Sequence, residues 1–164
     1  MISVVGILIV GGLVGVGVIL HRYTSADHLG VLDDPAVINV ADPACEQMAR
    51  SVRDAAPAAA ASPTDVATAI RVQDAAITMM VAKIRAVGSD RLQNDQPATA
   101  WLADWERLVG LREAFADELA AGGHPTLVVP QVDGARVTIR MDEVGLSEGC
   151  AVADELAHPA STAR

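Results

Sequence analysis

The chain has 164 residues and a formal net charge of −9, from 21 acidic and 12 basic residues. Every charged side chain follows residue 21, so the polar part repels phosphate backbones and we expect no nucleic-acid partner. The roughly 120 residues after Asp42 suffice for one small domain with its own core. Because aromatic residues are scarce, Trp101 and Trp105 should be the largest pieces of that core.

The first twenty residues read as a membrane anchor. Residues 2–20 are uncharged, and Ser3 is their only polar side chain. At about 1.5 Å per helical residue this run spans roughly 28 Å, close to the hydrocarbon thickness of a bilayer. The sequence therefore predicts a transmembrane anchor over residues 1–22 and an integral membrane protein.

Three other interpretations of this run are weaker. A cleaved signal peptide has a positive start and a shorter apolar core, and no Lys or Arg precedes this one. Gly12, Gly15 and Gly17 suggest a dinucleotide fingerprint, but the chain that follows offers no βαβ unit. Gly11 and Gly15 form a small-xxx-small pair, so homodimerisation through this helix is a secondary hypothesis.

The flanking charges and the cysteines disagree about orientation. Arg22 alone follows the apolar run closely, which favours a cytoplasmic C-terminal domain by one charge. Cys45 and Cys150 can form one intramolecular bridge, which requires an oxidising compartment. We expect the bridge and an extracytoplasmic domain; two buried free thiols are the alternative, and without CxxC or CxxH spacing a metal site is the weakest reading.

The segment between the anchor and the domain should be a stalk over residues 23–42, with a short extended piece at Ala36–Val40. The first helix of the domain is predicted over Pro43–Ala56, because Asp42 can cap it and proline suits the first helical position. Its apolar residues recur at helical spacing.

Two longer helices follow. Ser62, Pro63 and Asp65 form a capping-box start for a helix that should end at Gly88. A polar loop over Ser89–Gln96 then leads to a helix at Pro97–Ala121.

The pattern changes after Gly122-Gly123. Thr126–Val129 and Arg136–Ile139 alternate around Asp133-Gly134, which predicts a β-hairpin. A short helix at Ala151–Ala157 and a disordered tail over residues 157–164 complete the chain. We therefore expect an α+β protein: one transmembrane helix, then a domain over residues 43–156 with about three helices and a hairpin.

No group of residues has catalytic, cofactor-binding or metal-binding spacing. Asp104 should form a surface ion pair with Arg107, and the histidines stand in loops or near the tail. Arg112 lies on the same helical stripe as Trp105, so it should stack on a tryptophan or pair with Asp95 or Asp142. We take Trp101, Asp104, Trp105 and Arg112 as a structural motif.

That motif resembles a family of actinobacterial single-pass membrane proteins. The matching features are Asp95, the W-x-x-D-W helix at residues 101–105, Arg112 followed by Phe115, the predicted hairpin, Met141 and Cys150. The MDEVGLSEGC spacing is longer than in the family pattern. The resemblance implies a membrane-tethered extracytoplasmic domain and no known activity.

We expect a non-enzymatic interaction or scaffold module of the cell envelope. One alternative is an envelope hydrolase or small-molecule binder whose site assembles from dispersed residues such as Asp104, Arg112 and His124. Convergence of those side chains in a pocket would favour it, whereas an exposed apolar patch would favour partner binding. The other alternative is an accessory subunit of a membrane complex.

Overall fold

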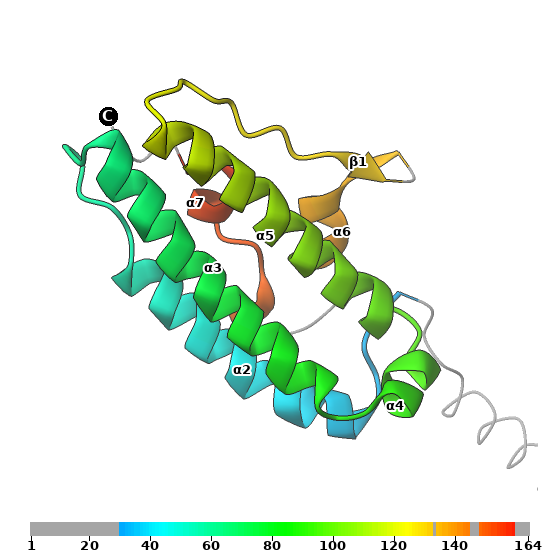
Figure 1. The fold of residues 1–164 in the computed structure, drawn as a ribbon. Helices are drawn as coiled ribbons and strands as arrows, with labels where there is room; N and C mark the ends of the chain where they lie inside the picture. The colour runs from blue at the N-terminus through cyan, green and yellow to red at the C-terminus, as the bar shows by residue number, and fades with distance from the viewer. Residues whose placement is uncertain (1–29, 133, 145–147, 160–164) are drawn as a thin grey trace, which may run out of the picture.

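The computed structural model describes residues 30–132, 134–144 and 148–159 (Figure 1). The elements in chain order are α2 (Pro35–Asp54), α3 (Pro63–Arg85), α4 (Ser89–Asn94), α5 (Ala98–Ala120), β1 (Gln131–Val132), β2 (Ala135–Arg136), α6 (Val137–Asp142), the 3₁₀ turn η1 (Glu148–Cys150) and α7 (Asp154–Ala157).

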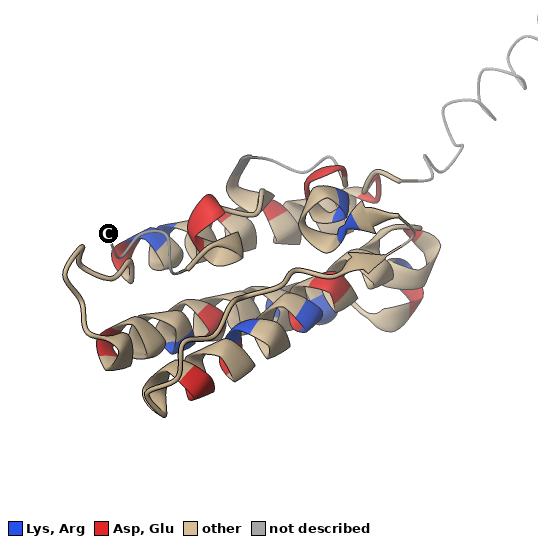
Figure 2. Ribbon diagram, turned by 90° about the horizontal axis from the view of Figure 1, so that it is seen from above, with Lys and Arg blue, Asp and Glu red and all other residues tan. Residues whose placement is uncertain are grey.

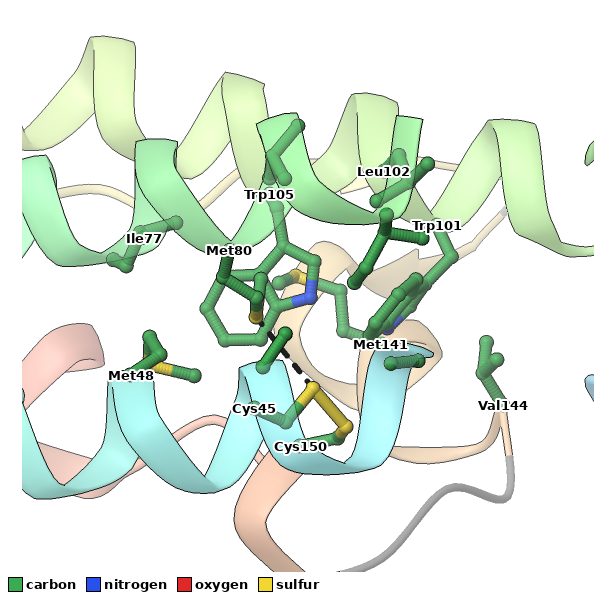
Figure 3. Close-up of a cluster of buried hydrophobic side chains, with 14 of the residues drawn as sticks. Cys45, Met48, Ile77, Met80, Trp101, Leu102, Trp105, Met141, Val144 and Cys150 are labelled. Atoms are coloured by element: carbon green, nitrogen blue, oxygen red, sulfur yellow. Dashed lines mark hydrogen bonds between the residues drawn. A yellow bond between two sulfur atoms is a disulfide. The ribbon is translucent and has the colours of Figure 1, made fainter. Parts of the chain in front are cut away.

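Three long helices form the body of the molecule. Helix α3 lies between α2 and α5 and packs against both, and α6 and α7 lie on the far side (Figure 1). A core of aliphatic, methionine and tryptophan side chains fills the space between these elements (Figure 3). A smaller cluster around Ile70 and Phe115 closes the other end of α3 and α5.

The α+β prediction is wrong. Of the described residues, 67 % are helical, and the sheet in that part of the chain has two strands of two residues each. The predicted strand Thr126–Val129 is extended but unpaired, and Val137–Ile139 belongs to α6. Val137, Met141 and Val144 are buried at helical spacing, so burying that stripe outweighs the β propensity of Val137, Thr138 and Ile139.

The predicted stalk and first helix also need correction. Helix α2 starts at Pro35, with Asp34 as its N-cap accepting from the Ala36 amide at 2.7 Å. The expected extended piece at Ala36–Val40 is therefore helical, and Pro43 lies inside the helix. Interior proline costs about 3 kcal/mol. The buried side chains of Val37 and Ala41 continue the stripe of Cys45 and offset that cost.

A long-range contact selects this start. The Asp95 carboxylate accepts hydrogen bonds from the amides of Asp33 and Asp34, at 3.3 and 3.2 Å. Leu32, which precedes them, is buried and donates its amide to the Val144 carbonyl at 3.1 Å. Residues 31–42 thus belong to the folded domain.

The two central helices begin and end close to the predicted positions. Ser62 and Asp65 form the capping box of α3, and Gly88 adopts a φ of +111° two residues after the Ala86 C-cap. The predicted loop at Ser89–Gln96 instead contains α4. Helix α5 begins one residue after the expected proline.

The predicted disulfide is present. Cys45 of α2 and Cys150 of η1 are bonded, and both are buried (Figure 3). Cys45 Sγ lies 3.5 Å from Met80 Sδ; an oxidised cysteine has no S–H, so this is a packing contact. A side chain at Gly149 would place its Cβ 3.1 Å from the Glu46 amide nitrogen, so glycine lets η1 approach α2 closely.

The C-terminal prediction is partly wrong. Helix α7 spans Asp154–Ala157, and Pro159 is buried, so residues 157–159 are not a disordered tail. Residues 160–164 lie outside the described part of the chain, as does the predicted anchor at residues 1–22. None of the helices in the described ranges has the length and apolarity needed to cross a membrane.

Candidate interaction face

The two tryptophans of the W-x-x-D-W helix are core residues. Their rings pack edge to face, with centroids 6.3 Å apart and an interplanar angle of 85° (Figure 3). Both indole nitrogens are buried and have no hydrogen-bond partner among the described residues. Such groups weaken a fold, so the area that the rings bury must compensate for them.

Asp104 pairs with Arg107 as predicted, but Asp104 is buried and not at the surface. Its carboxylate accepts hydrogen bonds from Arg107 on the same helix and from Arg140 of α6, the latter at 2.8 Å. Only 3 % of the Asp104 side chain is exposed, so these pairs are shielded from solvent on the carboxylate side. Asp104 therefore ties α6 to α5.

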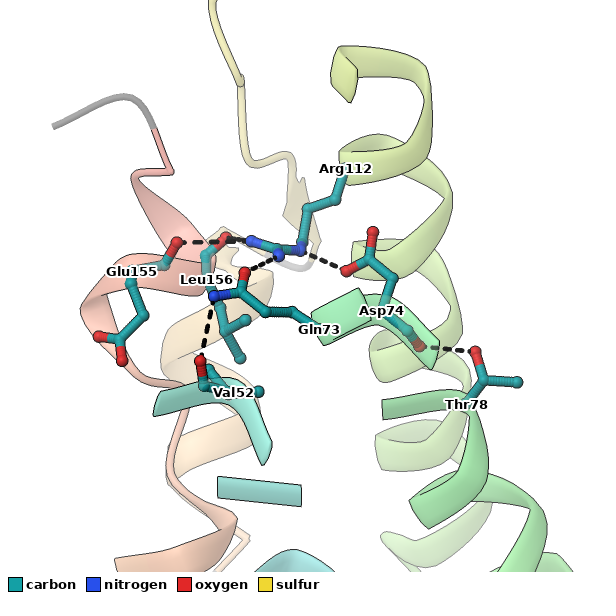
Figure 4. A network of polar contacts seen from close by, with 7 residues as sticks. All are labelled: Val52, Gln73, Asp74, Thr78, Arg112, Glu155 and Leu156. Atoms are coloured by element: carbon teal, nitrogen blue, oxygen red, sulfur yellow. Dashed lines mark hydrogen bonds and ion pairs between the residues drawn. The ribbon is translucent and has the colours of Figure 1, made fainter. Parts of the chain in front are cut away.

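Arg112 is fully buried and organises a polar network (Figure 4). Its Nε donates to Asp74 Oδ1 at 2.6 Å, and its Nη2 donates to Gln73 Oε1 at 2.6 Å. Its Nη1 donates to the Leu156 carbonyl at 2.8 Å. The predicted partners, Asp95 and Asp142, instead accept backbone amides elsewhere. The network links α5, α3 and α7.

Gln73 and Asp74 complete this network differently. Gln73 extends the network to α2, because its side-chain amide donates to the Val52 carbonyl at 3.2 Å. The Asp74 carboxylate uses one oxygen only, since its Oδ2 is buried and finds no partner in the described part of the chain. Burial raises the pKa of Asp74 to about 6, and the Arg112 guanidinium opposes that rise only in part.

The dispersed residues suggested for a catalytic site do not converge. Asp104 borders a hollow of about 180 Å³ whose lining includes neither Arg112 nor His124. His124 is exposed in the segment after α5. No group of three potential metal ligands of the His, Cys, Asp or Glu type gathers within the described residues.

The outward side of α3 carries an apolar strip. Val72 and Met79 are 53 % and 56 % exposed, and Ala75 and Ala82 are exposed between and beyond them. These four residues, here called the outer seam, follow one another at steps of three, four and three. That is the a/d spacing of a coiled-coil helix, and it lies opposite the buried stripe of Ile70, Ile77 and Ile84. The buried stripe of α3 alone does not predict this seam.

Polar contacts border the outer seam on both sides. On the α5 side, Arg71 pairs with Asp117 at 2.8 Å and Arg85 pairs with Glu106 at 2.9 Å. On the α2 side, Lys83 donates to Gln47 at 2.6 Å. Acidic and basic positions are interspersed along the helices (Figure 2). An apolar centre with a polar rim is the usual anatomy of a protein interface.

A hollow of about 40 Å³ opens between α2 and α3 beside this seam, with Met48, Ala76 and Met79 in its lining. It is too small for a metabolite. It gives the seam a depression next to the Met79 side chain.

No model of a protein family matches the sequence, and neither the curated proteins nor the solved structures contain a match to it. The resemblance to actinobacterial membrane proteins therefore stays a prediction.

Proposed function

We propose that the chain is a membrane-anchored, non-enzymatic interaction module of the cell envelope, and that it binds protein through the outer seam of α3. The observation that carries this proposal is the seam itself. Two large apolar side chains, Val72 and Met79, are more than half exposed in a regular strip with a polar rim. Exposed apolar residues usually occur singly, whereas an ordered strip marks a binding surface.

Two features support the location. Residues 2–20 have the length and composition of a membrane span. The buried Cys45–Cys150 disulfide is typical of proteins that fold in an oxidising compartment.

The proposed partner binding is favoured over a catalytic role. Asp104 and Arg112 are engaged in buried ion pairs that connect helices, and His124 stands apart from both. A catalytic group must reach a substrate, and the side chains of the first two are buried and already paired.

Photo-cross-linking in the host cell tests partner binding. A photoreactive phenylalanine analogue at position 79 should give a discrete cross-linked protein. The same group at position 128 should not, because Val128 is 71 % exposed but lies outside the outer seam. Equal labelling from both positions, or none from position 79, would refute the proposal.

The location needs a separate probe, because both native cysteine side chains are buried and bonded to each other. A Val128→Cys variant offers one accessible thiol. A membrane-impermeant maleimide should label it in intact cells; labelling only after lysis would place the domain in the cytoplasm.

A further inference from the structure

We propose that the occupant of the outer seam is the same seam of a second copy of this chain, packed antiparallel. This inference rests on the proposed function and names its partner. The dimer axis passes between Ala75 and Met79, so that each helix covers the apolar strip of the other.

The sizes of the seam residues favour this direction. In the a/d spacing of the outer seam, the larger residues Val72 and Met79 occupy the a positions. The small residues Ala75 and Ala82 occupy the d positions. An antiparallel copy places Met79 over Ala75 and Val72 over Ala82, so every layer pairs a large side chain with a small one. A parallel copy in register would instead stack Met79 on Met79 and Ala75 on Ala75, which leaves alternating bulges and gaps.

The rim charges favour the same direction. Antiparallel packing brings the Arg71–Asp117 pair beside the Arg85–Glu106 pair of the second copy. The two ion pairs, each already neutral within its own chain, then lie side by side on one rim. Lys83, on the other rim, faces the start of the second α3, where Asp65 is exposed on the same face of the helix. The two surfaces are thus complementary to themselves in shape and in charge.

Disulfide trapping with the full-length chain in mild detergent tests the arrangement. Ala75→Cys and Met79→Cys variants carry different tags and are mixed before oxidation. Each has one accessible thiol, because the native pair is already bonded. We expect the mixed 75–79 product to exceed the 75–75 and 79–79 products at least about tenfold, since only the mixed pair shares a layer.

Two controls sharpen the result. Val128→Cys mixed with Met79→Cys should give no product above background. Val72→Lys introduced into both partners should remove the 75–79 product, because a buried unpaired ammonium is costly at an apolar contact. Circular dichroism of each variant verifies that the helices persist.

The other outcomes overturn the inference. Dominant 75–75 and 79–79 products would indicate parallel packing, and absence of all three would exclude a second copy at the seam. In the second case a discrete adduct of a different protein from position 79 in cells would leave the proposed function standing. Absence of both results would remove the two proposals together.

Discussion

Each side of α3 carries two exceptions to the usual distribution of polarity. Its inner side buries Gln73 and Asp74 in a network around Arg112, while its outer side exposes Val72 and Met79. The inner side obtains its polar partners from α5, α7 and α2. On the outer side, the apolar side chains of Val72 and Met79 stay more than half exposed within the described chain. Under the proposed function, α3 packs on its own fold with the inner side and on a partner with the outer side.

Removing the cation from the inner side should have the largest effect. Arg112→Met leaves Asp74 buried without its partner, and we expect a loss of about 3–5 kcal/mol of unfolding free energy. Urea unfolding measures this loss. The double variant Arg112→Met/Asp74→Leu should recover part of the stability, because it removes both charges. A double variant no more stable than the single one would contradict an ion-pair role.

Removing the disulfide should have the second-largest effect on stability. Cys45 contacts Met80 on the inner side of α3, and its bond to Cys150 closes a loop with a sequence separation of 105. We expect Cys45→Ala/Cys150→Ala to lose about 2–4 kcal/mol, because the unfolded chain gains freedom. Thermal unfolding with and without reductant checks this: reductant should lower the Tm of the parent and leave the variant unchanged.

The titration of Asp74 gives a smaller, pH-dependent effect. Its pKa is about 6 in the fold and ordinarily 3.8, so the folded state holds this proton more tightly. The stability that the group contributes is complete below pH 4 and declines as pH rises through about 6, by at most about 3 kcal/mol. The parent protein should therefore lose more stability than Asp74→Asn between pH 4 and pH 7 in urea unfolding. Equal changes in both proteins would contradict the raised pKa.

Substitutions on the outer side of α3 should barely change the unfolding free energy. Val72→Lys exposes an ammonium where the side chain is already in water, so the change in unfolding free energy should stay within about 0.5 kcal/mol in dilute protein. Ile77→Lys, five residues along the same helix but buried, is the matched comparison and should prevent folding. A large loss from Val72→Lys would show that the seam belongs to the core of a single chain.

Capping residues and apolar periodicity correctly predict the parts of the fold that neighbouring residues determine. The Ser62–Asp65 capping box and the apolar periodicity of α3 and α5 place two helices close to their observed limits. With two cysteines, the disulfide had one intramolecular solution. These predictions needed no knowledge of distant residues.

The predictions are wrong where a contact with a residue distant in the sequence determines the local structure. Two Asp-Pro pairs, at residues 34–35 and 42–43, both resemble a helix start, and Asp95 selects the first by accepting two amides there. Asp74 was not considered as the partner of Arg112, although its neighbour Gln73 lies on the buried stripe of α3. The outer seam had a visible signal, since apolar residues recur on both sides of that helix.

The attachment of Leu32 and Asp34 has a mechanical consequence. The chain enters the folded domain where the Leu32 amide is held by Val144 and where the amides of Asp33 and Asp34 are held by Asp95. A force applied from the N-terminal side therefore loads these three hydrogen bonds before it reaches the first turn of α2. Farther along that helix, Cys45 is joined covalently to Cys150, so tension that unwinds the first turns is arrested there.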